Sequence, residues 1–229
     1  MDKTTAVSIA VAALLIATPA LGQRFHVPVL PLPVADGELS IAGGIAGGMD
    51  DNSGKLDAFG GSIAYAMERF SFGMGWAYVR DVPQADSTKS EFTLAPVVAA
   101  YHLPILDDSP VTVSIQSGIG WMSVASAVPN DNTTLLNIPI GVSVQGSTTA
   151  GSLQIPLWVM PRVQFTRSST GGASSTETDF GASAGVLVVW KSGIGIGMTI
   201  DWLRTDDGTG TGTDSSEWLF GLGMSHRFH

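Results

Sequence analysis

Apolar residues alternate with small or polar residues along most of this chain. The alternation is clearest near the C-terminus, where one face of the pattern carries Trp218, Phe220, Leu222, Met224, His226 and Phe228. Small residues such as Gly221, Gly223 and Ser225 lie between them. A period of two is that of a β-strand with two unlike faces. The pattern therefore predicts an all-β chain.

Ten segments carry this alternation, and each is long for a strand. Globular strands usually have about five or six residues, whereas a tilted membrane strand needs about nine to eleven. The expected strands are Glu38–Met49, Ala58–Met67, Phe70–Asp81, Glu91–Leu103, Val111–Val124, Leu135–Gln145, Gln154–Arg167, Asp179–Trp190, Gly193–Thr205 and Ser216–Phe228. Their length favours strands that cross a membrane.

The connections between these segments alternate between short and long. Glu68-Arg69 and Lys191-Ser192 are tight, whereas Val82–Ser90, Ala125–Thr134 and Ser168–Thr178 are long and polar. Bacterial membrane barrels have short turns at one end, longer loops at the other and an even number of strands. We therefore expect a transmembrane antiparallel up-and-down β-barrel of about ten strands. Eight strands are possible if the segments containing Pro96 and Pro139 lie outside the sheet, because proline cannot donate to a strand ladder.

Aromatic residues gather at the two ends of the expected strands. Such girdles mark the two membrane interfaces of a lipid-facing barrel. The interface candidates are Trp76, Tyr78, Trp121, Trp202 and Trp218 at the long-loop end, and Phe70, Trp190 and Phe228 at the short-turn end.

From Gly37 to His229 the chain resembles the small bacterial outer-membrane β-barrel proteins, most specifically in its closing strand. In that superfamily the terminal strand usually ends on an aromatic residue, which the barrel-insertion machinery reads. Here His229 follows Phe228. The resemblance implies the outer membrane of a Gram-negative bacterium, with the lipid bilayer, lipopolysaccharide and the insertion machinery as partners.

The residues before the barrel divide into two expected segments. Residues 1–22 read as a cleaved signal peptide, with an apolar stretch and small residues at Ala20 and Gly22. Residues 23–36 contain three prolines and read as an irregular arm, whose part Phe25–Val34 is a candidate plug. Residues 37–229 form the barrel. The chain has no cysteine, which excludes disulfides, and its net charge of −9 argues against nucleic acid as a partner.

The inward register predicts a lumen with two unlike walls. The first three and last three strands place Gly, Ala and Ser inward, whereas the remaining strands place bulkier groups there. Two interpretations stay open: the large side chains fill the barrel, or a weakly polar cavity remains. The lumen-facing candidates are Arg162, Asp201, Trp158, Met160, Gln116 and Tyr101. Arg162 and Asp201 are expected to form a buried ion pair, because a charge inside a barrel normally finds a partner.

The sequence offers no catalytic constellation. Gly181–Gly185 matches G-x-S-x-G, but it lies within an expected strand rather than at the strand-to-helix turn that this hydrolase motif requires. The histidines show no zinc-binding spacing. Asp206, Asp207 and Asp214 lie in one loop and form a loose candidate calcium site, without the spacing of an EF-hand. We expect no catalytic residues and no cofactor.

These features favour a passive role, either as a narrow channel or as a barrel that binds a small solute. The alternative is a non-conducting structural or adhesion barrel that acts through its acidic external loops, and the third option is an outer-membrane hydrolase.

Overall fold

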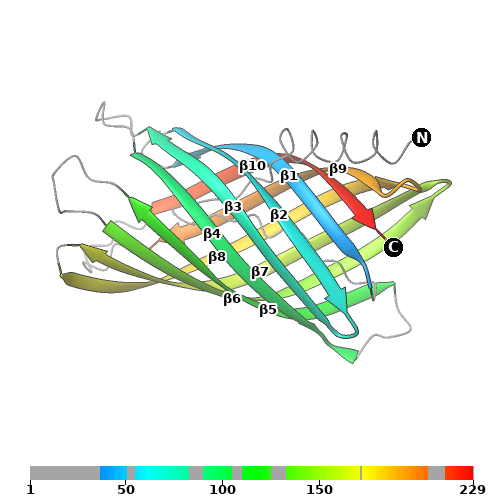
Figure 1. Cartoon of the computed structure of the whole chain (residues 1–229), viewed down its shortest axis with the longest axis horizontal. Coiled ribbons are helices and arrows are strands. Elements are labelled where there is room, and N and C mark those ends of the chain that lie inside the picture. Colours follow the sequence, from blue (N-terminus) through cyan, green and yellow to red (C-terminus); the bar gives the residue numbers. More distant parts are fainter. Residues whose placement is uncertain are drawn as a thin grey trace.

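The computed structural model describes residues 37–50, 55–82, 90–104, 110–124, 133–170, 172–205 and 215–228. These residues form a closed barrel in which each strand pairs with its neighbours in sequence and β1 pairs with β10 (Figure 1). All of these pairings are antiparallel, as in β1 with β10 and β1 with β2. The expected all-β up-and-down barrel is confirmed. Residues 1–22 and 23–36, including the candidate plug, lie outside the described residues.

Ten strands build the barrel wall. They are β1 (Leu39–Asp50), β2 (Lys55–Met67), β3 (Phe70–Val82), β4 (Ser90–His102), β5 (Val111–Val124), β6 (Thr133–Ala150), β7 (Leu153–Thr170), β8 (Ala173–Trp190), β9 (Ile194–Thr205) and β10 (Ser215–Phe228). The strand number is thus ten, not eight. The segments around Pro96 and Pro139 both belong to the sheet, as β4 and β6.

Three strands extend furthest beyond the bounds that the sequence pattern predicted. β6, β7 and β8 have 18 residues each, and they absorb most of the expected connections 146–153 and 168–178. The two hairpins instead close through short turns, with positive φ at Gly151 (63°) and Gly172 (88°). Glycine adopts this left-handed conformation without a steric penalty. The polar Ser and Thr residues beside these turns therefore belong to paired strands, although their sequence pattern is typical of a loop.

Prolines account for the irregular places in the barrel wall. The register between neighbouring strands is continuous except at four gaps of two positions each, and every gap contains one proline. Pro96 lies in the gap between β3 and β4, Pro139 between β5 and β6, Pro161 between β6 and β7, and Pro156 between β7 and β8. Each proline keeps its partner on the other neighbouring strand, as Pro96 does with Gly120. A proline without an N–H is tolerated in a strand when only one side of the ladder is interrupted.

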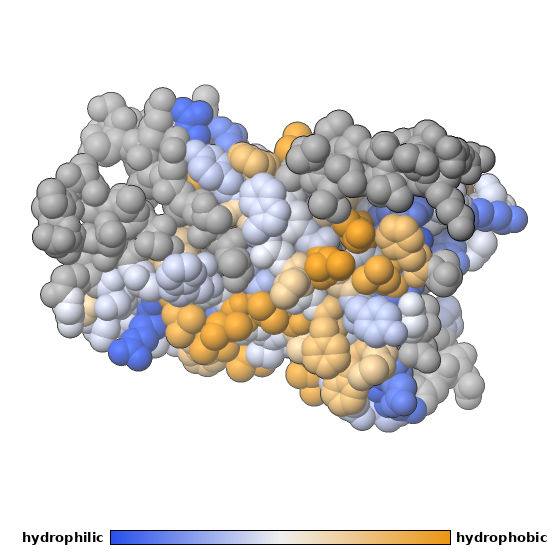
Figure 2. Space-filling model, viewed as in Figure 1, coloured by the Kyte–Doolittle hydropathy of each residue, from blue (hydrophilic) through white to orange (hydrophobic). Residues whose placement is uncertain are grey.

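The solvent exposure of the side chains alternates along the strands with the same period of two as the sequence pattern. On β3, for example, Met74 is 58% exposed whereas Ala77 is fully buried. Apolar side chains therefore cover the outer surface, and Figure 2 shows them gathered across the middle of the barrel with polar residues toward its ends. Within the part of the chain that the structure describes, no helix is long and apolar enough to cross a membrane.

Candidate functional site in the barrel interior

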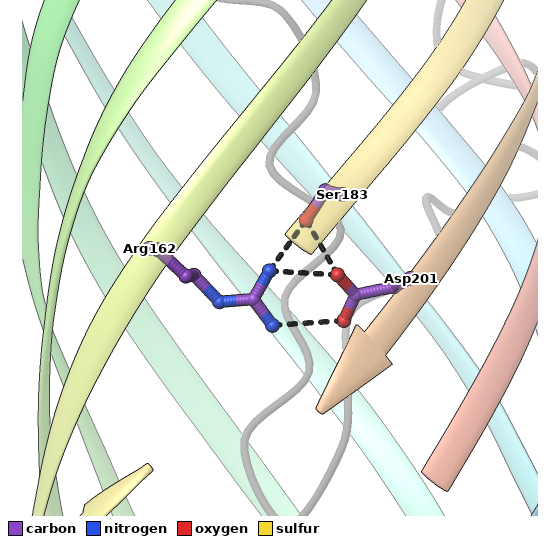
Figure 3. A network of polar contacts seen from close by, with 3 residues as sticks. All are labelled: Arg162, Ser183 and Asp201. Carbon is purple, nitrogen blue, oxygen red and sulfur yellow. Dashed lines mark hydrogen bonds and ion pairs between the residues drawn. The ribbon is translucent and has the colours of Figure 1, made fainter. Parts of the chain in front are cut away.

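A network of three polar side chains lies on the inner wall of the barrel. The guanidinium of Arg162 donates two hydrogen bonds to the carboxylate of Asp201, at 2.7 Å to Oδ1 and 3.0 Å to Oδ2. Ser183 accepts a hydrogen bond from Arg162 and donates one to Asp201 (Figure 3). Arg162 is 5% exposed and Asp201 1%. A two-pronged arginine–carboxylate contact is among the stronger polar contacts in proteins, and here each charge neutralises the other.

The strand register explains how this network forms. Arg162 on β7 lies directly opposite Gly181 on β8, and Ser183 on β8 lies directly opposite Asp201 on β9. Arg162 must therefore reach across β8. A side chain at Gly181 would obstruct this path, because a Cβ there would lie 3.2 Å from Cζ of Arg162 and 2.7 Å from the carbonyl oxygen of Trp202.

The second glycine of the same segment accommodates an aromatic ring. Trp158 lies directly opposite Gly185, and its ring atoms Cζ2 and Cη2 occupy the space that a Cβ at Gly185 would need. The G-x-S-x-G match is thus explained by packing. Gly181 leaves space for Arg162, Ser183 belongs to the polar network, and Gly185 leaves space for the ring of Trp158. As expected, the match lies in a strand and forms no nucleophile elbow.

Further polar contacts lie closer to the long-loop end of the same wall. Asn137 donates to Thr166 at 3.5 Å, and Thr166 donates to Asp179 at 3.3 Å. Gln164, which is 1% exposed, lies directly opposite Asp179 and has its side-chain nitrogen buried without a hydrogen-bond partner. The interior is therefore crossed by polar groups that bond mainly to one another.

Four buried apolar side chains lie toward the long-loop end of the interior. Val79, Met122, Leu203 and Leu219 are each 1% exposed or less, and each lies near the long-loop end of its strand. Leu219 lies directly opposite Asp201 on β9, and Leu203 lies directly opposite Gly181 on β8. These apolar side chains therefore adjoin the network of Arg162, Ser183 and Asp201.

A histidine bridges three strands at the opposite, short-turn end. The two ring nitrogens of His102 each lie 2.7 Å from a serine hydroxyl, Nε2 from Ser71 and Nδ1 from Ser114. All three side chains are buried, and Ser71 has no exposed surface. Nearby, Arg227 and Glu38 form an ion pair at 3.2 Å. Sequence reasoning missed the His102 cluster, because its partners come from strands whose register the sequence does not reveal.

Five of the six lumen-facing candidates lie inward and buried: Arg162, Asp201, Trp158, Met160 and Gln116. Gln116 donates to Ser143 at 2.8 Å. Tyr101 is a correction, because it lies on the outer surface, 37% exposed, with its ring 5.1 Å from that of Phe70. The run Val97–Ala100 on β4 is apolar on both faces, so its sequence does not tell which face is inward.

The interface aromatics lie on the outer surface. Trp76, Trp121, Trp218, Phe70, Trp190 and Phe228 are exposed, and Tyr78 and Trp202 are half-buried against Phe59 and Trp218. The loose calcium candidate, Asp206, Asp207 and Asp214, lies outside the described residues. Among the residues that the structure describes, no group of three or more acidic or histidine side chains could hold a metal ion.

No protein-family model matches the sequence, and no curated protein matches it significantly. Solved structures do match. The chain is similar to the β-domain of the Bordetella autotransporter BrkA, with 11% identity and a TM-score of 0.54 over 84% of this chain and 100% of that one. It is also similar to the translocator domain of the autotransporter NalP from Neisseria meningitidis, with 11% identity and a TM-score of 0.48 over 84% of this chain and 89% of that one. Neisserial surface protein A follows, with 10% identity and a TM-score of 0.40 over 84% and 100% of the two chains.

At such low identity these likenesses concern the fold alone. The likeness to the BrkA β-domain confirms the expected barrel fold and points to no particular subfamily.

Proposed function

We propose that this chain is a bacterial outer-membrane barrel that crosses the membrane with its strands and is closed to solutes at its long-loop end. Its membrane placement is supported by the exposed apolar residues between two aromatic girdles. Met74, Ile45 and Met198 are each more than half exposed. Exposing such groups to water is costly, whereas lipid covers them.

The burial of inward side chains is the observation that supports the functional part of the proposal. Side chains that line a water-filled pore contact water, whereas Arg162, Asp201 and Gln164 are 5% exposed or less. The buried apolar side chains Val79, Met122, Leu203 and Leu219 lie toward the long-loop end, with Leu219 directly opposite Asp201. The ion pair of Arg162 and Asp201 also leaves no unbalanced charge there to select ions. These features favour the non-conducting barrel over the narrow channel.

Solute entry into vesicles tests this proposal. Purified protein is refolded into liposomes, and its insertion is checked by flotation. Osmotic swelling is then followed in small uncharged sugars, because a weakly polar lumen would admit these most readily. We expect liposomes that contain the protein to swell at the same rate as liposomes without protein. Swelling that rises with the amount of inserted protein would contradict the closed barrel.

A second candidate function is binding of a small uncharged solute from the short-turn end. It is favoured by one observation: the inward residues Ser40, Ala42 and Ser62 of β1 and β2 are only partly buried. The interior is thus less tightly filled at these three positions than at Val79, Met122, Leu203 and Leu219. Ser62→Trp would fill this space, and it should abolish binding of such a solute while leaving the barrel folded.

The His102 cluster does not favour the hydrolase option. Ser71 and His102 are at the distance of a nucleophile and its base, but Ser71 has no surface that a substrate could reach. We therefore propose a structural role for this cluster, in which one histidine joins β3, β4 and β5.

A further inference from the structure

A groove of about 410 Å³ opens at the short-turn end of the barrel. It lies between the turn that joins β6 to β7 and the turn that joins β8 to β9. Its polar lining consists of Thr149, Ser152, Gln154 and Lys191. Sites for small ligands have volumes of roughly 300–1,000 Å³, so this groove suits a ligand of about the size of a monosaccharide.

The long hairpin of β6 and β7 builds one wall of the groove. The register of β6 with β5 ends at Gly146, whereas β6 pairs with β7 as far as Ala150, so the hairpin projects beyond β5 (Figure 1). Thr149 lies directly opposite Gln154, and Gln154 lies directly opposite Val189 on β8. These three residues therefore form one row across three strands.

This row lies on the inner face of the barrel wall. Residues an even number of positions apart in a strand share a face, and Gln154 shares its face with the buried Trp158. Val189 is 3% exposed and packs against Trp158 and Leu187, whereas Thr149 and Gln154 are exposed. The groove thus opens to water at the mouth of the barrel and not to the lipid outside the wall.

The turn between β8 and β9 forms a fixed rim on the other side. The N–H of Gly193 donates to the carbonyl oxygen of Trp190 at 2.9 Å, and its carbonyl oxygen accepts from the N–H of Arg227 at 2.9 Å. Gly193 has a φ of 83°, which glycine adopts without a steric penalty. A ligand therefore meets a preformed rim and loses little free energy to ordering the protein.

The groove carries one positive charge that is not balanced by a neighbour. Lys191 is exposed and makes no ion pair among the residues that the structure describes. Arg227 on the adjacent β10 is instead paired with Glu38. None of the described residues that line the groove is acidic. The groove therefore favours a ligand with one negative charge.

The uncharged polar side chains of the groove both donate and accept hydrogen bonds. Thr149 and Ser152 contribute hydroxyls, and Gln154 contributes a carboxamide. All three are exposed in the structure. Groups of this kind match a ligand that carries several hydroxyls and an amide.

We infer that this groove binds an N-acetylated amino sugar that carries a carboxylate, which is the chemistry of the glycan strands of peptidoglycan. Lys191 binds the carboxylate, Gln154 binds the acetamido group, and the hydroxyls of Thr149 and Ser152 bind those of the sugar. The short turns of bacterial barrels face the periplasm, where this polymer lies. The assignment to peptidoglycan therefore rests on the proposed membrane placement.

The site differs from the second candidate site proposed above. Ser40, Ala42 and Ser62 belong to β1 and β2, whereas the groove is built by β6, β7, β8 and the turn before β9. The solute of that other site is uncharged.

Fluorescence titration of the refolded protein in non-ionic micelles at low salt tests this inference. Trp190 lines the groove and Trp158 packs against its floor at Val189, so tryptophan emission reports binding. The probes are N-acetylmuramic acid and N-acetylglucosamine, which differ by the lactyl group that carries the carboxylate. We expect the acid to bind about two- to fivefold more tightly, because an ion pair of an exposed lysine contributes little.

Three variants distinguish the groove from other places. K191Q should bind both sugars with the lower affinity. K55Q is the matched control, since Lys55 lies at the long-loop end of β2, and it should keep the preference of the wild type. T149W should abolish binding of both sugars, because the indole fills the groove. Urea unfolding shows that each variant remains folded.

Several results would overturn the inference. These are no saturable binding of N-acetylmuramic acid, an undiminished preference in K191Q, and undiminished binding by folded T149W. Lactate that binds as tightly as N-acetylmuramic acid would overturn the assignment to a sugar. Failure of the wild type to float with vesicles would instead refute the membrane placement, and the peptidoglycan source with it, whereas the affinities in micelles test the groove itself.

Discussion

Glycines in this barrel provide space for particular side chains of the neighbouring strand. Gly181 makes room for Arg162, and Gly185 makes room for the ring of Trp158. Large and small residues therefore alternate across strand pairs on the inner wall. Packing on this scale is sensitive to a single added methyl group, because well-packed interiors cannot absorb extra volume without shifting side chains.

Gly185→Ala should destabilise the barrel by about 1–3 kcal/mol, because the new methyl group and the ring of Trp158 require the same space. Gly146→Ala is the matched control, since a Cβ there would meet only Val111, at 3.8 Å. Both substitutions place alanine in a strand. Urea unfolding in micelles, followed by tryptophan fluorescence, measures the difference. Equal stabilities of the two variants would refute this packing account.

A second prediction at the scale of single residues concerns the polar network of Arg162, Ser183 and Asp201. Asp201→Ala leaves the buried guanidinium of Arg162 without its counter-charge and should lower the free energy of unfolding by about 3–5 kcal/mol. The double variant Arg162→Met with Asp201→Leu removes both charges and should recover most of this loss. Urea unfolding of the single and double variants provides the measurement. A double variant as unstable as Asp201→Ala would show that the charges are not coupled.

Individual site residues could be placed from the sequence only where the alternation is unambiguous. Arg162 and Asp201 lie on strands with clear apolar outer faces, and both lie inward as the pattern predicted. Tyr101 lies on β4, where the run Val97–Ala100 is apolar on both faces, and its side was predicted wrongly. The partners of an inward residue depend on the register between strands, which is why Ser183 could not be predicted as the third member of the network.

At the scale of elements, the prolines divide the wall into regular and interrupted ladders. β1 pairs without interruption with both β10 and β2, whereas the four gaps lie between β3 and β8. The sequence suggested that Pro96 and Pro139 could exclude their segments from the sheet. They remain in it because each proline interrupts one side of the ladder and leaves the other side paired.

Hydrogen–deuterium exchange should reveal these gaps. One amide of the pair Gly75-Trp76 and one of the pair Gly118-Ile119 face interrupted ladder positions, so peptides containing these pairs should exchange faster than peptides in the seam between β1 and β10. The reason is that an amide without a ladder partner opens without breaking a strand hydrogen bond. Peptide-resolved mass spectrometry of the protein in micelles measures both sets. Equal protection in the gaps and in the seam would contradict the assigned pairings.

The length of the β6–β7 and β7–β8 hairpins was the other feature of the elements that could not be predicted from the sequence. The segments 146–150 and 173–178 are polar, and neither shows an apolar face, so the sequence predicts connections there. They form strand because the chain reverses sharply at Gly151 and Gly172, which brings the polar residues on either side into register. The exposed hydroxyls of Ser168 and Ser175 lie 2.7 Å apart across one such pair.

At the scale of the whole molecule, the sequence was sufficient to predict the barrel architecture. Ten alternating segments, an even strand count and aromatic residues at two levels follow from the period-two pattern, and the closed barrel has all three. Whether the lumen is open could not be predicted, because closure depends on which inward side chains meet. In the proposed closed barrel, closure is set by the buried apolar side chains Val79, Met122, Leu203 and Leu219 and by the ion pair of Arg162 and Asp201.

Single-channel conductance in a planar bilayer tests the closed barrel most directly. The refolded protein is first shown to be inserted by flotation with the same lipids, so that silence cannot arise from failed insertion. We predict an inserted but silent barrel, because the inward side chains Arg162 and Asp201 and the apolar side chains Val79, Met122, Leu203 and Leu219 are all buried. Discrete, reproducible current steps that scale with the amount of inserted wild-type protein would contradict the account and establish an open lumen.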